Sequence, residues 1–273
     1  MPYWIVLFLC FAVLVAACKE EANATACDAS TGTGDDAGEQ QDCDAEGQLR
    51  EVLAARRSAD YFNPFGTDPI TADDVKAICW AAQGITLPDA PTHWPGVLGL
   101  RTAPSAGATY PMEVYVIAER VTGMEQGAYR YLPMTDELVS TGATGPLTEA
   151  VAQIRMDEDP SSDPKVLGDA AALYVLASVQ QRTSAKYGWW AEMYVALEAG
   201  HVAQNMLLMA TARGLANRPW GALGLGSRQE VADLLMLPVD DPVEGATNPG
   251  CYQPSTSEAQ HWPLYFNGVG QKP

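Results

Sequence analysis

Two short clusters contain residue types that could bind a ligand. Arg56, Arg57 and Ser58 place two cations and a hydroxyl donor side by side, as a phosphate-binding segment requires. The same cluster also fits an ordinary basic helix C-terminus, where cations stabilise the macrodipole. The segment Pro104-Ser105-Ala106-Gly107 is small and turn-forming. It predicts either a plain turn before a strand or a loop whose backbone approaches a flat ring closely.

Charge excludes one broad class of function. The chain of 273 residues has 34 acidic and 16 basic side chains, a formal net charge of −18. A nucleic-acid binder needs a basic face, so this class is excluded. Much of the acid excess lies in residues 18–46, where Lys19 is the only base. Because such a segment has little to bury, we expect residues 18–47 to be a disordered, solvated tether rather than a cation-binding tail.

The N-terminus predicts export. Residues 3–17 are apolar without a break but are shorter than the roughly 20 residues that span a bilayer. A signal peptide over residues 1–17 fits this length better. The run ends at Val15-Ala16-Ala17-Cys18, which resembles a bacterial lipobox and makes Cys18 the expected lipidation site. An uncleaved anchor helix is the alternative, and either arrangement places the body outside the cytoplasm, anchored to the cell-envelope membrane.

The cysteines and histidines do not predict a metal site. The chain has 6 Cys and 3 His and no CxxC motif, so zinc and di-iron centres are not expected. Cys27 and Cys43 in the tether are candidates for a local disulfide. Cys79 lies in an apolar helical segment and is expected to be a buried small hydrophobe.

The elements that position the two clusters follow from hydrophobic period and capping residues. Thr71 and Asp74 predict the start of a helix, and Gly84 its end. The predicted helices are 48–57, 72–83, 147–156, 189–213 and 228–236. The predicted strands are 112–119, 127–132, 170–178 and 262–269, with 215–223 a loop or short strand. We therefore expect one α+β domain over residues 48–273, with helices around an antiparallel or mixed sheet and one long buried helix.

Four segments, in this order, resemble the nitroreductase superfamily, and its SagB-type dehydrogenase branch most closely. This branch includes the oxidases of azoline-containing peptides. The segments are Arg56-Arg57-Ser58-Ala59-Asp60-Tyr61-Phe62, Arg101–Glu113, Lys186-Tyr187 followed by Tyr194 and Glu198–Asn205, and Arg213-Gly214-Leu215 leading to Pro219-Trp220-Gly221-Ala222. The resemblance runs from about Leu49 to Val269 and implies a nitroreductase-like fold.

The same resemblance implies a homodimer with FMN held at the subunit interface. The cofactor-binding residues that it implies are Arg56, Arg57, Ser58, Pro104, Ser105, Ala106, Gly107, Gly221 and Ala222. The backbone N–H of Gly221 would face flavin N5, although this glycine also fits a loop position that requires a positive φ. Lys186 and Tyr194 match residues near the substrate of the azoline oxidases, where a lysine can transfer a proton or fix a carbonyl. The alternative is a surface lysine and a core tyrosine, and His201 and Asn205 are expected to be core or interface residues.

Two departures from the family pattern bear on the chemistry. Asp60 stands where relatives have a base near the flavin N1/O2 edge, so its carboxylate would oppose the charge of reduced flavin or point away. Trp189-Trp190 replace a Gly/Asp-Arg pair, which removes another base and adds an aromatic wall. Lys272 is the only late cation available to a phosphate.

These features predict an FMN-dependent oxidoreductase that transfers hydride in a ping-pong sequence with a small organic or peptide-derived substrate. The alternative, motivated by Asp60, is a non-catalytic envelope binding lipoprotein that retains the fold. A third hypothesis is an electron-transfer partner of another envelope enzyme.

Overall fold

The computed structural model describes residues 37–60, 63–88, 90, 99–158, 165–221, 225–238 and 261–273. The chain divides into two units between Ala54 and Ala55. In the first unit the described element is helix α2, Ala37–Ala55, whose exposed surface carries an ion pair between Arg50 and Glu46. This helix begins before the predicted start at residue 48, because Ala, Glu and Gln from residue 37 onward favour helix. The signal peptide, Cys18 and Cys27 lie outside the described residues, so the Cys27–Cys43 bridge stays a prediction.

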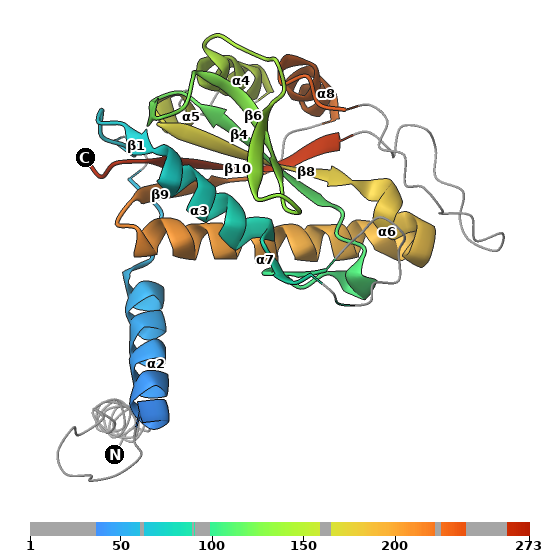
Figure 1. The fold of residues 1–273 in the computed structure, drawn as a ribbon. Helices are drawn as coiled ribbons and strands as arrows, with labels where there is room; N and C mark the ends of the chain where they lie inside the picture. Colours follow the sequence, from blue (N-terminus) through green and yellow to red (C-terminus); the bar gives the residue numbers. More distant parts are fainter. Residues whose placement is uncertain are drawn as a thin grey trace, which may run out of the picture. The chain divides into compact units, whose positions relative to one another are not determined.

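A six-stranded sheet forms the centre of the second unit (Figure 1). Its order is β7-β6-β4-β8-β10-β9, and every described pairing in it is antiparallel. The strands are β4 (Met112–Ala118), β6 (Gly127–Leu132), β7 (Glu137–Ser140), β8 (Ala172–Val179), β9 (Ala216–Trp220) and β10 (His261–Gly270). Two small pairs lie outside this sheet: β1 (Ile70–Thr71) with β5 (Val121–Thr122), and β2 (Ile85–Leu87) with β3 (Leu100–Arg101).

Helices cover both faces of the sheet. They are α3 (Ala72–Gln83), α4 (Leu147–Glu158), α5 (Lys165–Gly168), α6 (Gln180–Tyr187), α7 (Ala191–Ala212) and α8 (Leu225–Leu234), with short 3₁₀ turns at Ala106–Ala108 and Gly188–Trp190. One core packs α3 and α7 against the sheet, and the other packs α4 and α8 against the opposite face. Alternate residues of β4 and β8 enter the two cores, so these central strands are buried on both faces.

The predicted α+β, nitroreductase-like architecture is confirmed. Strand β6 has the predicted bounds, β4 ends one residue earlier, and the two pair as expected. Helix α3 has the predicted capping box, in which Thr71 and Asp74 exchange hydrogen bonds. Cys79 is buried in α3, and burial raises the pKa of its thiol far above the ordinary value.

The predicted long helix starts two residues later than expected, because a separate helix and a 3₁₀ turn precede it. Helix α6 ends where Gly188 adopts a φ of 56°, which breaks the helical path before α7 begins. Helix α7 buries one face in the core, while Met193 and Leu197 on its other face are exposed. None of the helices in the described ranges is both long and apolar enough to cross a membrane.

Candidate functional site

The loop from Pro104 to Tyr110 contains a strained turn. Gly107, Ala108 and Tyr110 have φ values of 59°, 53° and 42°, in the left-handed region. Alanine and tyrosine rarely adopt this conformation, so the surrounding structure must stabilise it. Strain of this kind is typical of ligand-binding loops and is a reason to ask what holds this one.

Ser105 joins the start of the loop to its end and to helix α7. Its hydroxyl donates a hydrogen bond to Glu198 Oε2 at 2.5 Å and accepts one from the Tyr110 N–H at 2.9 Å. Thr109 Oγ1 lies 2.9 Å from Thr183 Oγ1 of α6. The loop is therefore fixed to α6 and to α7 by side chains of this chain.

Two arginines hold Tyr110, one at its ring and one at its carbonyl. The guanidinium of Arg101 lies 4.6 Å from the centre of the Tyr110 ring and donates to Gln83 Oε1 at 2.5 Å. Arg182 Nη1 donates to the Tyr110 carbonyl at 2.9 Å and to Glu113 Oε1 at 2.7 Å. Cation–π and charge-assisted contacts of this kind lock the positive φ of Tyr110 in place.

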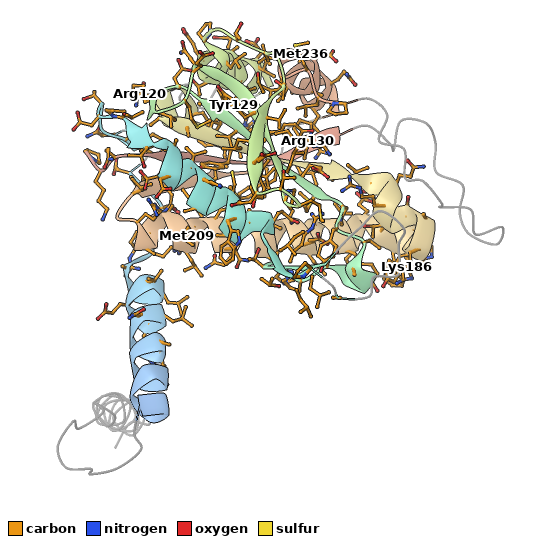
Figure 2. The ribbon with its side chains drawn as sticks, in the orientation of Figure 1. Arg120, Tyr129, Arg130, Lys186, Met209 and Met236 are labelled. Carbon is orange, nitrogen blue, oxygen red and sulfur yellow. The ribbon has the colours of Figure 1, made fainter. Side chains whose placement is uncertain are left out.

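Lys186 and Tyr187, at the end of α6, meet the turn at Gly107 (Figure 2 labels Lys186). Lys186 Nζ donates to the Gly107 carbonyl at 3.2 Å. A Cβ at position 107 would collide with Lys186 Nζ and with the Tyr187 hydroxyl, so both side-chain ends would have to move, and the φ of 59° would strain any residue other than glycine. Tyr194 packs edge-on against Tyr187, with ring centres 4.8 Å apart. The structure thus brings Lys186 and Tyr194 to the Gly107 loop, and Lys186 is half-buried rather than a free surface lysine.

Glu198 is a buried acid beside this loop. Burial raises the pKa of its carboxyl to about 7, although the Ser105 hydrogen bond and the charges of Arg101 and Arg182 oppose the rise. Its Oε1 atom has no hydrogen-bond partner within the described part of the chain. Glu198 and Tyr187 belong to the family-like motifs of the sequence but were given no role there, and Arg182 was not identified. An acidic residue in an apolar helical stretch was the available signal for Glu198.

The Arg56-Arg57-Ser58 segment lies at a different place, beside strand β9. The Ala59 N–H donates to the Asn217 carbonyl at 2.8 Å, and Arg218 Nη1 donates to the Ala59 carbonyl at 2.5 Å. Arg57 and Ser58 are exposed and Arg56 is half-buried. Two guanidinium groups and a hydroxyl next to a fixed backbone are a donor set that suits a phosphate.

Gly221 follows β9 and is exposed. Its φ lies outside the left-handed region, and no atom lies within 4 Å of where a Cβ would stand. The expectation that this glycine requires a positive φ is therefore wrong. Ala222 lies outside the described residues. Asp60 is exposed, and its Oδ1 accepts a hydrogen bond from the Asn63 N–H in a local turn.

Helix α7 separates the two groups of residues. Glu198 contacts the loop at Ser105, whereas Thr211 contacts Asn217 of β9. Thr211 lies thirteen residues after Glu198 in the helix, which is about 20 Å along the axis. Figure 1 shows α6 at one end of α7 and β9 at the other. The structure therefore does not bring Arg56, Arg57 and Ser58 to the Gly107 loop within one chain.

Exposed aromatic side chains lie in the 3₁₀ turn between α6 and α7. Trp189 and Trp190 stack with ring centres 4.0 Å apart, and Trp189 is 78% exposed. His201 is exposed, so it is not a core histidine in this chain. Asn205 donates to the Thr102 carbonyl at 3.3 Å and thereby fixes the segment before the loop.

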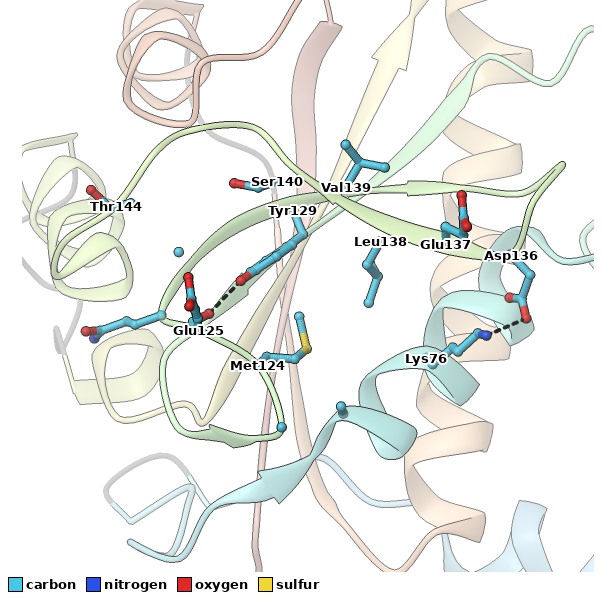
Figure 3. A pocket seen from close by; sticks show the side chains of 14 residues that line it. Lys76, Met124, Glu125, Tyr129, Asp136, Glu137, Leu138, Val139, Ser140 and Thr144 are labelled. Atoms are coloured by element: carbon cyan, nitrogen blue, oxygen red, sulfur yellow. Dashed lines mark hydrogen bonds and ion pairs between the residues drawn. The ribbon is translucent and has the colours of Figure 1, made fainter.

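A separate groove of about 820 Å³ lies along the β6–β7 hairpin (Figure 3). Met124, Tyr129 and Leu138 line it, and Lys76 and Asp136 form an ion pair of 3.1 Å at its side. None of the site residues predicted from the sequence lines this groove. The predicted residues instead gather at the two ends of α7.

Comparison with known proteins identifies the family. The Nitroreductase family model matches residues 53–248. The chain is similar to the nitroreductase relative MJ1384 of Methanocaldococcus jannaschii, with 31% identity over 209 residues that cover 72% of this chain and 92% of the relative. It is also similar to the microcin B17-processing protein McbC of Escherichia coli, with 29% identity over 126 residues that cover 44% of this chain and 43% of McbC.

A solved structure from Ralstonia eutropha, described as a nitroreductase, shares the fold. Its TM-score is 0.57 at 21% sequence identity, with 82% of this chain and 83% of that chain covered. The strained Gly107 loop, the basic segment beside β9 and five of the six strands of the central sheet lie within the matched residues, whereas β10 follows them. This chain therefore belongs to the Nitroreductase family.

Proposed function

We propose that this protein is an FMN-dependent oxidoreductase of the SagB type, acting on a small organic or peptide-derived substrate. The observation that carries the proposal is the cluster at Gly107, where a strained turn, Lys186 and the Tyr187 hydroxyl meet in one chain. The 29% identity to McbC, a microcin-processing protein, supports the peptide-derived class of substrate.

The residues present fit the cofactor. Arg56, Arg57 and Ser58 supply the charge and donors that an FMN phosphate needs in a protein of net negative charge. At Gly107 the absence of a side chain lets backbone lie close to a flat ring. Gly221 is exposed, so a ligand can approach its backbone, whose N–H would be a donor. When bound, FMN would supply hydride transfer, alternately accepting and giving up the hydride.

The roles of this chain's own side chains follow from their contacts. Lys186 Nζ, held by the Gly107 carbonyl, is placed to give a proton to a substrate atom or to hold a substrate carbonyl. Tyr194 supports this arrangement through its ring contact with Tyr187. Asp60 does not argue against the cofactor, because its Oδ1 takes part in a local turn.

A homodimer completes this proposed site. The phosphate-binding segment and the Gly107 loop lie about 20 Å apart along α7, so two copies are needed to bring one of each together. Exposed Trp189 in the 3₁₀ turn before α7, together with exposed Met193 and Leu197 of α7, provides an apolar surface for the second copy. Members of the family commonly form dimers, which supports this assembly. We further propose that the protein is exported and lipid-anchored through Cys18, as the N-terminal sequence predicts.

The visible spectrum of the purified full-length protein, recorded before and after addition of FMN, tests the proposal. We expect flavin absorption bands that co-elute with a dimer on size exclusion. No retained flavin, even after reconstitution at high FMN, would reject the oxidoreductase and favour the alternative, a binding lipoprotein that keeps the fold.

A second experiment tests the catalytic role of Lys186. In the flavin-loaded protein we expect Lys186→Met to lower turnover by about 100-fold, the usual contribution of a positioned acid or base. Lys76→Met, at the distant groove, is the matched control and should leave turnover unchanged. Equal turnover in both variants would remove Lys186 from the mechanism.

A further inference from the structure

Glu198 is a buried acid that the stability of the fold does not explain. It is 3% exposed, and only one of its two carboxyl oxygens has a hydrogen-bond partner in the described residues. An ionised carboxylate with an unpartnered oxygen is costly in a protein interior. Buried groups that cost stability are concentrated at functional sites.

The charged groups that face Glu198 are the same ones that hold the loop. Arg101 and Arg182 lower the pKa of Glu198 through their charge, yet neither forms an ion pair with it among the described contacts. Arg182 is instead paired with Glu113. Arg101 stacks on the Tyr110 ring and Arg182 binds the Tyr110 carbonyl. Any change in the charge of Glu198 is therefore felt by both arginines that hold Tyr110.

Ser105 gives Glu198 a direct connection to the same loop. The hydroxyl that donates to Glu198 also accepts from the Tyr110 N–H. The Glu198 carboxyl therefore contacts the start of the loop through its hydrogen bond with Ser105. It acts on the end of the loop, at Tyr110, through Ser105 and through its charge interaction with the two arginines.

We propose that Glu198 is a positioning residue that exchanges a proton. Its carboxylate form holds Ser105 and the left-handed turn from Gly107 to Tyr110 firmly, and its carboxylic acid form holds them loosely. The proton comes from solvent and binds at Oε1, the oxygen without a partner, so no other bond is made or broken. The proposal rests on the proposed function, because the loop matters for the cofactor only if the protein binds one.

The two forms differ in the strength of their contacts. A carboxylate accepts a charge-assisted hydrogen bond from Ser105, roughly twice as strong as a neutral one. It also attracts Arg101 and Arg182, which the neutral acid does not. The pKa of about 7 means that both forms are populated near neutral pH.

Hydrogen exchange of the full-length protein without added FMN tests the proposal directly. Amides of Ser105–Tyr110 are followed from pH 6 to pH 8 and expressed as protection relative to the unfolded peptide at each pH. These amides exchange through local openings of the loop in which Glu198 stays buried. We expect their protection in the wild type to rise about fivefold over this range, although the free energy of global unfolding falls. Glu198→Gln, which keeps an acceptor but has no charge, should show no rise. The matched control, Glu149→Gln on the exposed surface of α4, should follow the wild type.

A rise that persists in Glu198→Gln, or no rise in the wild type, would overturn the proposal. If Glu198→Gln does not fold, Ser105→Ala takes its place, since it breaks the connection and should also abolish the rise. FMN titration of the wild type at pH 6 and pH 8 forms a separate arm, with about fivefold tighter binding expected at pH 8. Absence of FMN binding would reject the proposed function and leave the exchange result to decide the role of Glu198.

Discussion

The two ends of α7 differ in how they are held. At the α6 end, the Pro104–Tyr110 loop is fixed by Ser105, Thr109 and Lys186 through contacts within the chain. At the β9 end, Arg57 and Ser58 are exposed, although the backbone beside them is fixed at Ala59. The first end is preorganised before any ligand binds, whereas the second presents charge toward solvent. In the proposed function, the rigid loop would contact the flavin ring and the exposed basic segment would bind the phosphate, and a preorganised loop reduces the entropic cost of binding the ring.

The largest effect should come from removing charge at the β9 end. Arg56→Ala combined with Arg57→Ala should weaken FMN binding by about 100-fold or more, because each charge-assisted contact contributes about 1.5–3 kcal/mol. Folding stability should change little, since Arg57 is exposed. Equilibrium titration of FMN by fluorescence checks this. Arg50→Ala on the exposed helix α2 is the matched control, and an equal loss there would contradict phosphate binding by the pair.

The next effect is a pH dependence of stability at the α6 end. The pKa of Glu198 is raised from 4.5 to about 7 in the folded protein, so between these values the folded state binds more protons than the unfolded state. The contribution of this group is complete below pH 4.5 and is lost as pH rises through 7, a change of about 3 kcal/mol. Urea denaturation of the wild type and Glu198→Gln over this pH range measures it. The variant should lack this slope, and identical slopes would show that Glu198 does not titrate there.

Substitution of one glycine at each end of α7 compares how strongly the two ends constrain the backbone, with folding stability as the measurement. Gly107→Ala should destabilise the protein by about 2 kcal/mol, because alanine is strained at positive φ and its Cβ would collide with Lys186 and Tyr187. Gly221→Ala should change the free energy of unfolding by less than about 0.5 kcal/mol, since no atom lies near its Cβ position. Thermal unfolding compares the two. Similar losses would mean that the loop end is not the more constrained one.

The smallest expected effect concerns how α7 is fixed near β9. Burial raises the pKa of Asp74, but hydrogen bonds from Thr71 and the ion pair with Arg213 outweigh burial and lower it. This cluster ties the start of α3 to the end of α7. Thr71→Ala should cost about 1 kcal/mol, the usual value of an N-cap. Chemical denaturation checks this value, and a loss above about 3 kcal/mol would show that the cluster does more than cap a helix.

The sequence predicted well those elements that have strong local signals. Strands β4 and β6 were found from alternation and β-branched residues, and α3 from its capping box. Strand β7 was missed because its four residues are mostly exposed and carry no clear period. Helix α6 was missed because its sequence is polar and Gly188 separates it from α7 by a change of backbone direction.

The candidate site was predicted in part. Lys186, Tyr194 and the Pro104–Gly107 segment were identified from family-like motifs, and the structure brings them together. Glu198 stood in one of these motifs but was given no role, and Arg182 was not identified, because a residue type alone does not reveal which loop it faces. The expectation about the φ of Gly221 was wrong for the same reason, since exposed loop backbone is set by its neighbours.

The sequence by itself determined the class of fold, the chemical types at each cluster and the family resemblance. These depend on local period, capping and short motifs, which act over a few residues. Only the tertiary structure decided that α7 separates the basic segment from the Gly107 loop, and that Glu198 lies between two arginines and Ser105. Long-range packing sets these relations, because residues far apart in the chain meet only after the sheet and helices have assembled.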